Sequence, residues 1–188
     1  MARPRSDDKR LAILSAALRT IAAQGPGAAT ATIAREAGVS NGSLFTYFET
    51  KAALLNQLYL DLKAEMVAEA LDGLPADREL REQLHFMWVH WLHWATSCPD
   101  KRRTLAYLDV SEEITAESRA AAHGMMAGVA RLLEQSREHG PMRAVPLAFL
   151  LALLSALADT TTDFIIRDPA NAERHREAGF NALWRMIA

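Results

Sequence analysis

The stretch TIAREAGVSNGSLFTYFETKAALL, residues 32–55, decides the fold of this chain. It contains two short segments with helical spacing, and only three residues separate them. Gly38 can take the left-handed conformation that ends a helix, and Ser40 is a good N-cap for the helix that follows. The stretch therefore predicts a helix-turn-helix, with the second short helix over residues 41–47.

This second helix begins with polar residues. The N-terminal end of a recognition helix meets base edges in the DNA major groove, and here that end reads Asn41-Gly42-Ser43. Asparagine offers both a donor and an acceptor, glycine allows close backbone approach, and serine can bind a base or a phosphate. The segment is therefore suited to reading DNA.

The rest of this helix divides between two faces. We expect Val39, Leu44 and Phe48 to pack inside the module. That leaves Phe45 and Thr46 outside, where they could touch thymine methyl groups or sugars. Phosphate contacts are expected from Tyr47 and Lys51, and from the arm residues Arg3, Arg5, Lys9 and Arg10.

The pattern resembles the helix-turn-helix and following helix of the TetR (tetracycline-repressor-like) family of transcriptional regulators. That family's pattern runs Ile-Ala, Ala-Gly-Val-Ser, a small residue, a Leu-aromatic pair, Tyr-Phe, and then Lys before apolar residues. The matching positions are Ile33, Ala34, Ala37, Gly38, Val39, Ser40, Gly42, Ser43, Leu44, Phe45, Tyr47, Phe48, Lys51 and Leu54.

The resemblance implies a homodimeric transcription regulator, usually a repressor, that binds a palindromic DNA operator and responds to a small molecule. Ala31 departs from the long polar or basic residue that many members carry, and Phe45 replaces the usual Tyr. Specificity should therefore depend strongly on Asn41 and Ser43. By position, the family's DNA contacts correspond to Thr30, Thr32, Ser40, Asn41, Gly42, Ser43, Phe45, Thr46, Tyr47 and Lys51.

Helical spacing continues along the chain, and no segment shows the alternation of a strand. We expect an all-α protein of about nine helices. Residues 1–50 are predicted to form a three-helix DNA-binding domain, and residues 51–188 a ligand-binding and dimerisation domain, with helix 51–71 connecting them. The expected helices cover residues 6–24, 30–37, 41–47, 51–71, 77–97, 101–110, 115–139, 145–167 and 170–187.

The charge distribution supports this division. Residues 1–60 hold seven Lys and Arg against four Asp and Glu, whereas the remainder holds 14 against 19. A basic module on an acidic body suits contact with nucleic acid. The single Cys98 fits a reducing cytoplasm, and the uncharged run over residues 144–158 is shorter than the roughly 20 residues of a membrane span. We expect a cytoplasmic protein without a membrane partner.

HFMWVHWLHWATSC, residues 85–98, is the second informative stretch. On a helix its Trp side chains share one arc and its His side chains the opposite arc. Aromatic and Met side chains around few polar groups suit a small-molecule pocket, although a plain hydrophobic core explains the same Trp stripe. The pocket candidates are Trp88, Trp91, His93, Trp94, Tyr107, Met125, Met126 and Phe149.

Metal and enzyme functions find little support. A metal site at His90 and His93 lacks a third ligand that the sequence can place. An enzyme that uses His93 as base with Asp109 or Glu113 lacks both a nucleophile and a paired acid. We therefore expect no metal, no other cofactor and no catalytic residue.

The last two long helices carry many large apolar residues, and the family's dimer forms from its last two long helices. The dimer candidates are Leu150, Leu154, Leu157, Phe164, Phe180, Leu183 and Trp184. We hypothesise that an effector, expected to be apolar or aromatic, shifts helix 51–71 and so changes the spacing of the two recognition helices. The alternative is a constitutive DNA-binding regulator without an effector.

Overall fold

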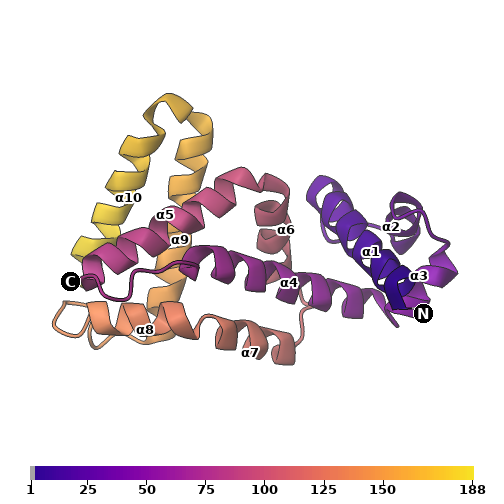
Figure 1. Cartoon of the computed structure of the whole chain (residues 1–188), viewed down its shortest axis with the longest axis horizontal. Coiled ribbons are helices and arrows are strands. Elements are labelled where there is room, and N and C mark those ends of the chain that lie inside the picture. Colours follow the sequence, from indigo (N-terminus) through magenta and orange to yellow (C-terminus); the bar gives the residue numbers. More distant parts are fainter. Residues whose placement is uncertain (1–2) are drawn as a thin grey trace. The chain divides into compact units, whose positions relative to one another are not determined.

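The computed structural model describes residues 3–188, with side chains from residue 7 onward. The described residues form ten α-helices, one short 3₁₀ helix and no strand, which confirms the predicted all-α fold (Figure 1). The helices are α1 (Arg3–Gln24), α2 (Thr30–Glu36), α3 (Asn41–Tyr47), α4 (Lys51–Leu71), α5 (Leu80–Ser97), α6 (Pro99–Asp109), α7 (Ala116–Met125), α8 (Ala127–Ser136), α9 (Leu147–Arg167), η1 (Pro169–Asn171) and α10 (Ala172–Ile187).

Packing divides the chain into two compact units. Unit 1 comprises the chain up to Ala64 together with Pro99–Ala122, and unit 2 comprises Glu65–Cys98 and His123–Ala188. Helices α4 and α7 contribute residues to both units. These units are defined by packing, whereas the predicted domains, residues 1–50 and 51–188, are defined by function. The predicted division therefore stays a prediction.

Unit 1 is built around α1, with α2 and α3 beside it (Figure 1). Ile13 and Ile21 on the inner stripe of α1 have no exposed surface. Helix α6 also packs on α1. At this contact the Thr104 hydroxyl donates to the Leu18 carbonyl at 3.2 Å. A segment from the middle of the chain is thereby part of the same unit as the helix-turn-helix.

Helix α4 holds the loop between α6 and α7 through a row of polar side chains. The Asn56 side-chain oxygen accepts the Thr115 amide at 2.9 Å. Two turns further along, Lys63 Nζ lies 3.0 Å from an Asp109 carboxylate oxygen. Burial, with a smaller contribution from Asp109, raises the pKa of Tyr59 to about 12. These contacts fix the loop against α4 within unit 1.

Unit 2 brings α5, α9 and α10 together, with α9 and α10 running side by side (Figure 1). Trp88 of α5 is fully buried, and its indole N–H donates to the Arg176 carbonyl at 3.1 Å. A Cβ atom at Gly179 would lie 2.5 Å from Thr161 Oγ1 and 2.8 Å from the Trp88 ring. The absence of a side chain at Gly179 therefore permits this close approach.

The prediction of one helix over residues 115–139 is wrong, because the chain breaks into α7 and α8 at Met126. The Met126 amide donates to the His123 carbonyl, three residues back, at 3.1 Å. Gly124 and Gly128 flank the break, and glycine disfavours a continuous helix. This break raises the predicted number of helices from nine to ten.

Helix α9 is long and apolar enough to cross a membrane by length and composition alone, with a mean hydropathy of 1.6. One such helix is weak evidence for a membrane span, because core helices of soluble proteins share both properties. Only 33% of its apolar window is buried within this chain. Much of this helix is therefore exposed in the single chain.

Candidate DNA-binding site

The helix-turn-helix forms where the sequence predicts it. Gly38 takes the left-handed conformation, with φ of +68°. The next amide, that of Val39, donates to the Ala34 carbonyl at 3.0 Å and closes the turn. Leu44 and Phe48 are 0% and 4% exposed, which confirms that they pack inside the module.

The other side of α3 faces outward. Asn41 and Gly42 are exposed at the N-terminal end of the helix, and Thr46 is exposed one turn later. Phe45 is 40% exposed, an unusual position for a large aromatic side chain with no role in the core. The predicted contacts that are half-buried on this helix are Ser43 and Tyr47.

Two hydroxyl groups near this surface are already engaged within the module. Ser40 Oγ accepts the Ser43 amide at 3.1 Å and so caps α3. Thr46 Oγ1 donates to the Gly42 carbonyl at 3.3 Å. Ser40 therefore acts as the predicted N-cap, and its hydroxyl hydrogen remains available to a phosphate oxygen.

Replacing this cap should weaken the module measurably. A Ser40→Ala variant is expected to lose about 1 kcal/mol in free energy of unfolding, because one helix N–H loses its acceptor. Chemical denaturation measures the loss. Ser15→Ala is the matched control, since Ser15 is exposed within α1. Equal effects at both positions would contradict the capping role.

The start of α4 carries a second N-cap beside the predicted phosphate contact. Thr50 Oγ1 accepts the Ala53 amide at 3.0 Å, and Lys51 is half-buried in the first turn. The N-terminus of a helix favours anions. At the start of α2, Thr30 and Thr32 are both half-buried.

The basic arm is described only in part. Lys9 is exposed, as a phosphate contact requires. Arg10 is half-buried, and its guanidinium lies 5.2 Å from the centre of the Phe48 ring, so part of its role is to cover the module core. The predicted contacts at Arg3 and Arg5 involve side chains outside the described residues.

Comparisons with known proteins agree with this geometry. The family model described as "Bacterial regulatory proteins, tetR family" matches residues 13–58. The structure of a TetR-family transcription regulator from Shewanella sp. PV-4 is 30% identical in sequence, with a TM-score of 0.87. The match covers 96% of this chain and 98% of that protein.

The chain belongs to the TetR family. A second TetR-family regulator, from Marinobacter aquaeolei VT8, is 26% identical with a TM-score of 0.82, and the match covers 99% of this chain and 98% of that one. The FadR regulator from Bacillus subtilis, solved with stearoyl-CoA, shares the fold at 16% identity, with a TM-score of 0.71 and coverage of 95% and 99%. These relatives are transcription regulators and not enzymes.

The predicted pocket residues of this TetR-family chain fall into different environments. Trp88, Trp91 and Trp94 are 0%, 8% and 4% exposed and belong to the core of unit 2. The indole N–H of Trp94 donates to a Glu65 carboxylate oxygen at 3.0 Å. Among the other candidates, His93 is exposed, whereas Met125 and Met126 are half-buried at the helix break. Tyr107 and Phe149 are 38% and 54% exposed. Their role in ligand binding stays a prediction.

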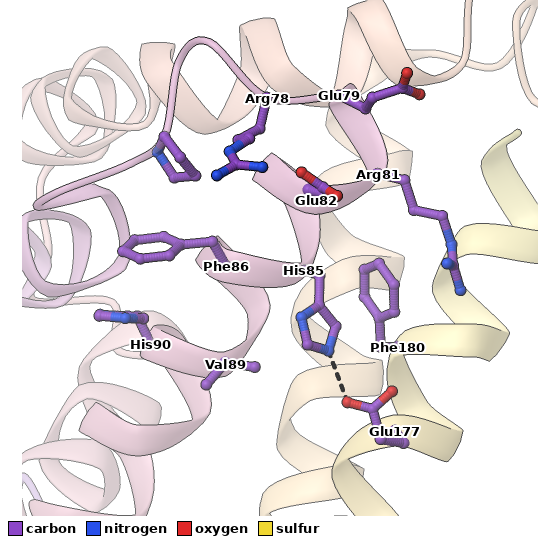
Figure 2. A pocket seen from close by; sticks show the side chains of 11 residues that line it. Arg78, Glu79, Arg81, Glu82, His85, Phe86, Val89, His90, Glu177 and Phe180 are labelled. Carbon is purple, nitrogen blue, oxygen red and sulfur yellow. Dashed lines mark hydrogen bonds and ion pairs between the residues drawn. The ribbon is translucent and has the colours of Figure 1, made fainter.

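A groove of about 870 Å³ lies elsewhere on unit 2, along α5 and beside α10 (Figure 2). None of the eight predicted pocket residues lines it. His85 Nε2 lies 2.7 Å from a Glu177 carboxylate oxygen and joins the two helices there. The lining residues are Pro75, Arg78, Glu79, Arg81, Glu82, His85, Phe86, Val89, His90, Glu177 and Phe180.

Part of this groove lies on a helix side that is visible in the sequence. His85 and His90 were placed on the arc opposite the Trp residues, and that arc is the one that borders the groove. The stretch gave no sign of Glu177 and Phe180, which lie about 90 positions later in the sequence. Within the described residues, no group of three or more His, Cys, Asp or Glu side chains could hold a metal ion.

Four of the predicted dimer contacts are buried within the single chain. Leu150, Leu154, Phe180 and Leu183 are at most 1% exposed, because they form the interface between helices of their own chain. Their part in a dimer stays a prediction. Of the other three, Phe164 is 50% exposed, whereas Leu157 and Trp184 are half-buried.

A different stripe of α9 is open. Phe149, Leu153, Leu157 and Phe164 follow one another at steps of four, four and seven residues, so they share one side of the helix. Phe149 is 54% exposed, and the two leucines are half-buried. On α10 the exposed apolar side chains are small, namely those of Ala178 and Ala182.

Proposed function

We propose that this TetR-family regulator is a homodimeric repressor that binds a palindromic DNA operator and is released by a small apolar or aromatic effector. The observation that carries the DNA-binding part is the outward end of α3. There Asn41 and Gly42 stand exposed, while Leu44 and Phe48 hold the helix to the module. A helix held in this way can enter the major groove with its polar end towards the bases.

The open stripe of α9 supports the homodimer. Exposed apolar side chains that line up over several turns mark an interaction surface. The stripe defined by Phe149, Leu153, Leu157 and Phe164 would pack against the same surface of a second copy, and the small Ala178 and Ala182 on α10 would allow close approach. A two-fold dimer matches an operator with two half-sites spaced by whole turns of DNA.

An effector is supported by the family context rather than by a site in this chain. FadR from Bacillus subtilis, which shares the fold, was solved with stearoyl-CoA. An effector releases DNA only when it binds the DNA-free conformation more tightly. The competing proposal is a constitutive regulator, and unchanged operator binding across a broad metabolite panel would favour it. A DNA-binding regulator with these properties acts in the cytoplasm.

Asn41→Ala tests the DNA-binding proposal. The variant should lose about 1–3 kcal/mol of discrimination between operator and random DNA, because Asn41 supplies the hydrogen bonds to a base edge. Fluorescence anisotropy at several salt concentrations measures both affinities. Gln135→Ala, at an exposed position of α8, is the control. Equal weakening on both DNAs would show that Asn41 contacts only the backbone.

Salt dependence provides a separate test of the whole proposal. Phosphate contacts make the affinity fall steeply as the salt concentration rises. The proposed operator recognition would be overturned if the protein did not bind the DNA upstream of its gene, or if salt did not affect that binding.

A further inference from the structure

The groove on unit 2 has a chemical character that operator binding and dimerisation leave unused. It runs along α5, between the turn at Pro75 and the α10 residues Glu177 and Phe180 (Figure 2). Its volume of about 870 Å³ lies within the range of small-molecule sites. The residues that line it indicate which class of molecule it would accept.

One wall is aromatic. The rings of Phe86 and His90 stack with their centres 4.0 Å apart and their planes 22° from parallel. Both side chains are only half-buried, so the pair offers ring surface to a molecule in the groove (Figure 2). Offset stacking on such a wall favours a planar aromatic molecule over a flexible chain.

A carboxylate, that of Glu82, continues the same side of α5. Glu82, Phe86 and His90 follow one another at steps of four residues, which places them in one row along the helix, and Glu79 is the N-cap residue that precedes the helix. Glu79 and Glu82 are exposed, and neither carboxylate has a side-chain or backbone partner among the described residues. Each turn of the helix rises about 5.4 Å. A positive charge near Glu82 would thus lie roughly one turn from the centre of the aromatic wall.

The groove has two arginine residues, and among the described residues only one of them contacts other side chains. Arg81 donates to Asn181 at 3.2 Å, and its guanidinium lies 5.6 Å from the centre of the Phe180 ring. The protein therefore already places one cation over an aromatic ring beside the groove. Arg78 is exposed, and its guanidinium has no partner among the described residues. Of the charged groups that line the groove, three are carboxylates (Glu79, Glu82 and Glu177) and two are guanidiniums (Arg78 and Arg81), so the carboxylates outnumber the guanidiniums.

We propose that this groove binds a planar aromatic cation. The rings stack on Phe86 and His90, and the positive group lies toward Glu82. Arg78 opposes the binding because its charge has the same sign as that of the ligand. The site is separate from the buried Trp residues of α5 and does not depend on whether the ligand affects operator binding.

A matched pair of probes tests the sign of the charge. The 9-aminoacridinium ion is planar and positive, and anthracene-9-carboxylate carries a negative group at the same position of a three-ring system of the same shape. The full chain is titrated with each probe in the absence of DNA, using probe fluorescence. The cation should bind at least about 10-fold more tightly, as expected when charge complementarity discriminates between ligands of the same shape.

Substitutions then locate the bound cation. Glu82→Gln should weaken cation binding about 3–10-fold, whereas Arg78→Gln should strengthen it by a similar factor, since each change alters one unit of charge beside the ligand. Phe86→Leu keeps an apolar side chain but removes the ring surface, and it should weaken both probes. Glu138→Gln, at an exposed carboxylate outside the groove, should change nothing. Thermal unfolding verifies that each variant is folded.

Three results would overturn the proposal. One is equal or tighter binding of the carboxylate probe. Another is a Glu82→Gln effect no larger than that of Glu138→Gln. The third is Phe86→Leu binding the cation as tightly as the original chain. Loss of operator binding in a separate assay would bear on the repressor proposal and leave this one unaffected.

Discussion

Gly179→Ala is expected to lower the free energy of unfolding by about 2–3 kcal/mol, because a buried interface would have to accept a methyl group without space for it. The new Cβ would lie 2.5 Å from Thr161 Oγ1 and 2.8 Å from the Trp88 ring. Neither neighbour can move easily. The Thr161 hydroxyl donates to the Leu157 carbonyl at 2.8 Å, and Trp88 has no exposed surface.

Gly124→Ala is the matched control for this prediction. Gly124 also lies within a helix, but nothing comes within 4 Å of a Cβ atom there. Alanine is favoured over glycine in a helix by up to about 1 kcal/mol, so this variant should be neutral or more stable. Urea denaturation of both variants measures the difference. A Gly179→Ala variant as stable as Gly124→Ala would show that α5, α9 and α10 do not pack as described.

Leu157→Glu combined with Phe164→Glu is expected to leave a folded monomer that binds the operator on the order of 100-fold or more weakly. The two carboxylates would lie unpaired in the proposed dimer interface, where burying a charge is costly. A monomer reaches a single half-site and loses the gain from simultaneous binding. Sedimentation velocity at micromolar concentration and anisotropy on operator DNA measure the two effects.

Ala148→Glu is the control for the dimer prediction, because Ala148 is exposed on α9 away from the open stripe. It should remain dimeric and bind the operator normally. A Leu157→Glu, Phe164→Glu variant that sediments as a dimer would place the association surface elsewhere. Because both substituted side chains are at least partly exposed in the single chain, loss of folding is not expected to explain a positive result.

The helix-turn-helix could be predicted almost residue by residue because its signals are local. A glycine with positive φ ends α2, a serine hydroxyl caps α3, and both effects act within four residues of the sequence. The predicted limits of α3 and α4 agree with the structure for the same reason. The break at Met126 was missed because two helical segments with a shared apolar side look like one long helix until their packing is known.

The sites of unit 2 could not be predicted to the same extent. An apolar residue on a helix can face its own core or a second molecule, and periodicity does not distinguish the two. Leu154 and Leu157 differ by less than one turn, yet only Leu154 is completely enclosed. The groove depends on Glu177 and Phe180 meeting α5, which is a contact between distant parts of the chain.

The family, the all-α fold and the side of α3 that faces outward can be predicted from the sequence alone, because they follow from local backbone preferences and from a motif of matching residues. Which Trp, Leu and Phe side chains form the core and which remain exposed becomes clear only from the packing of the helices. Burial is a property of the packed chain: it depends on which helices meet, and helices far apart in sequence meet only when the whole unit is folded.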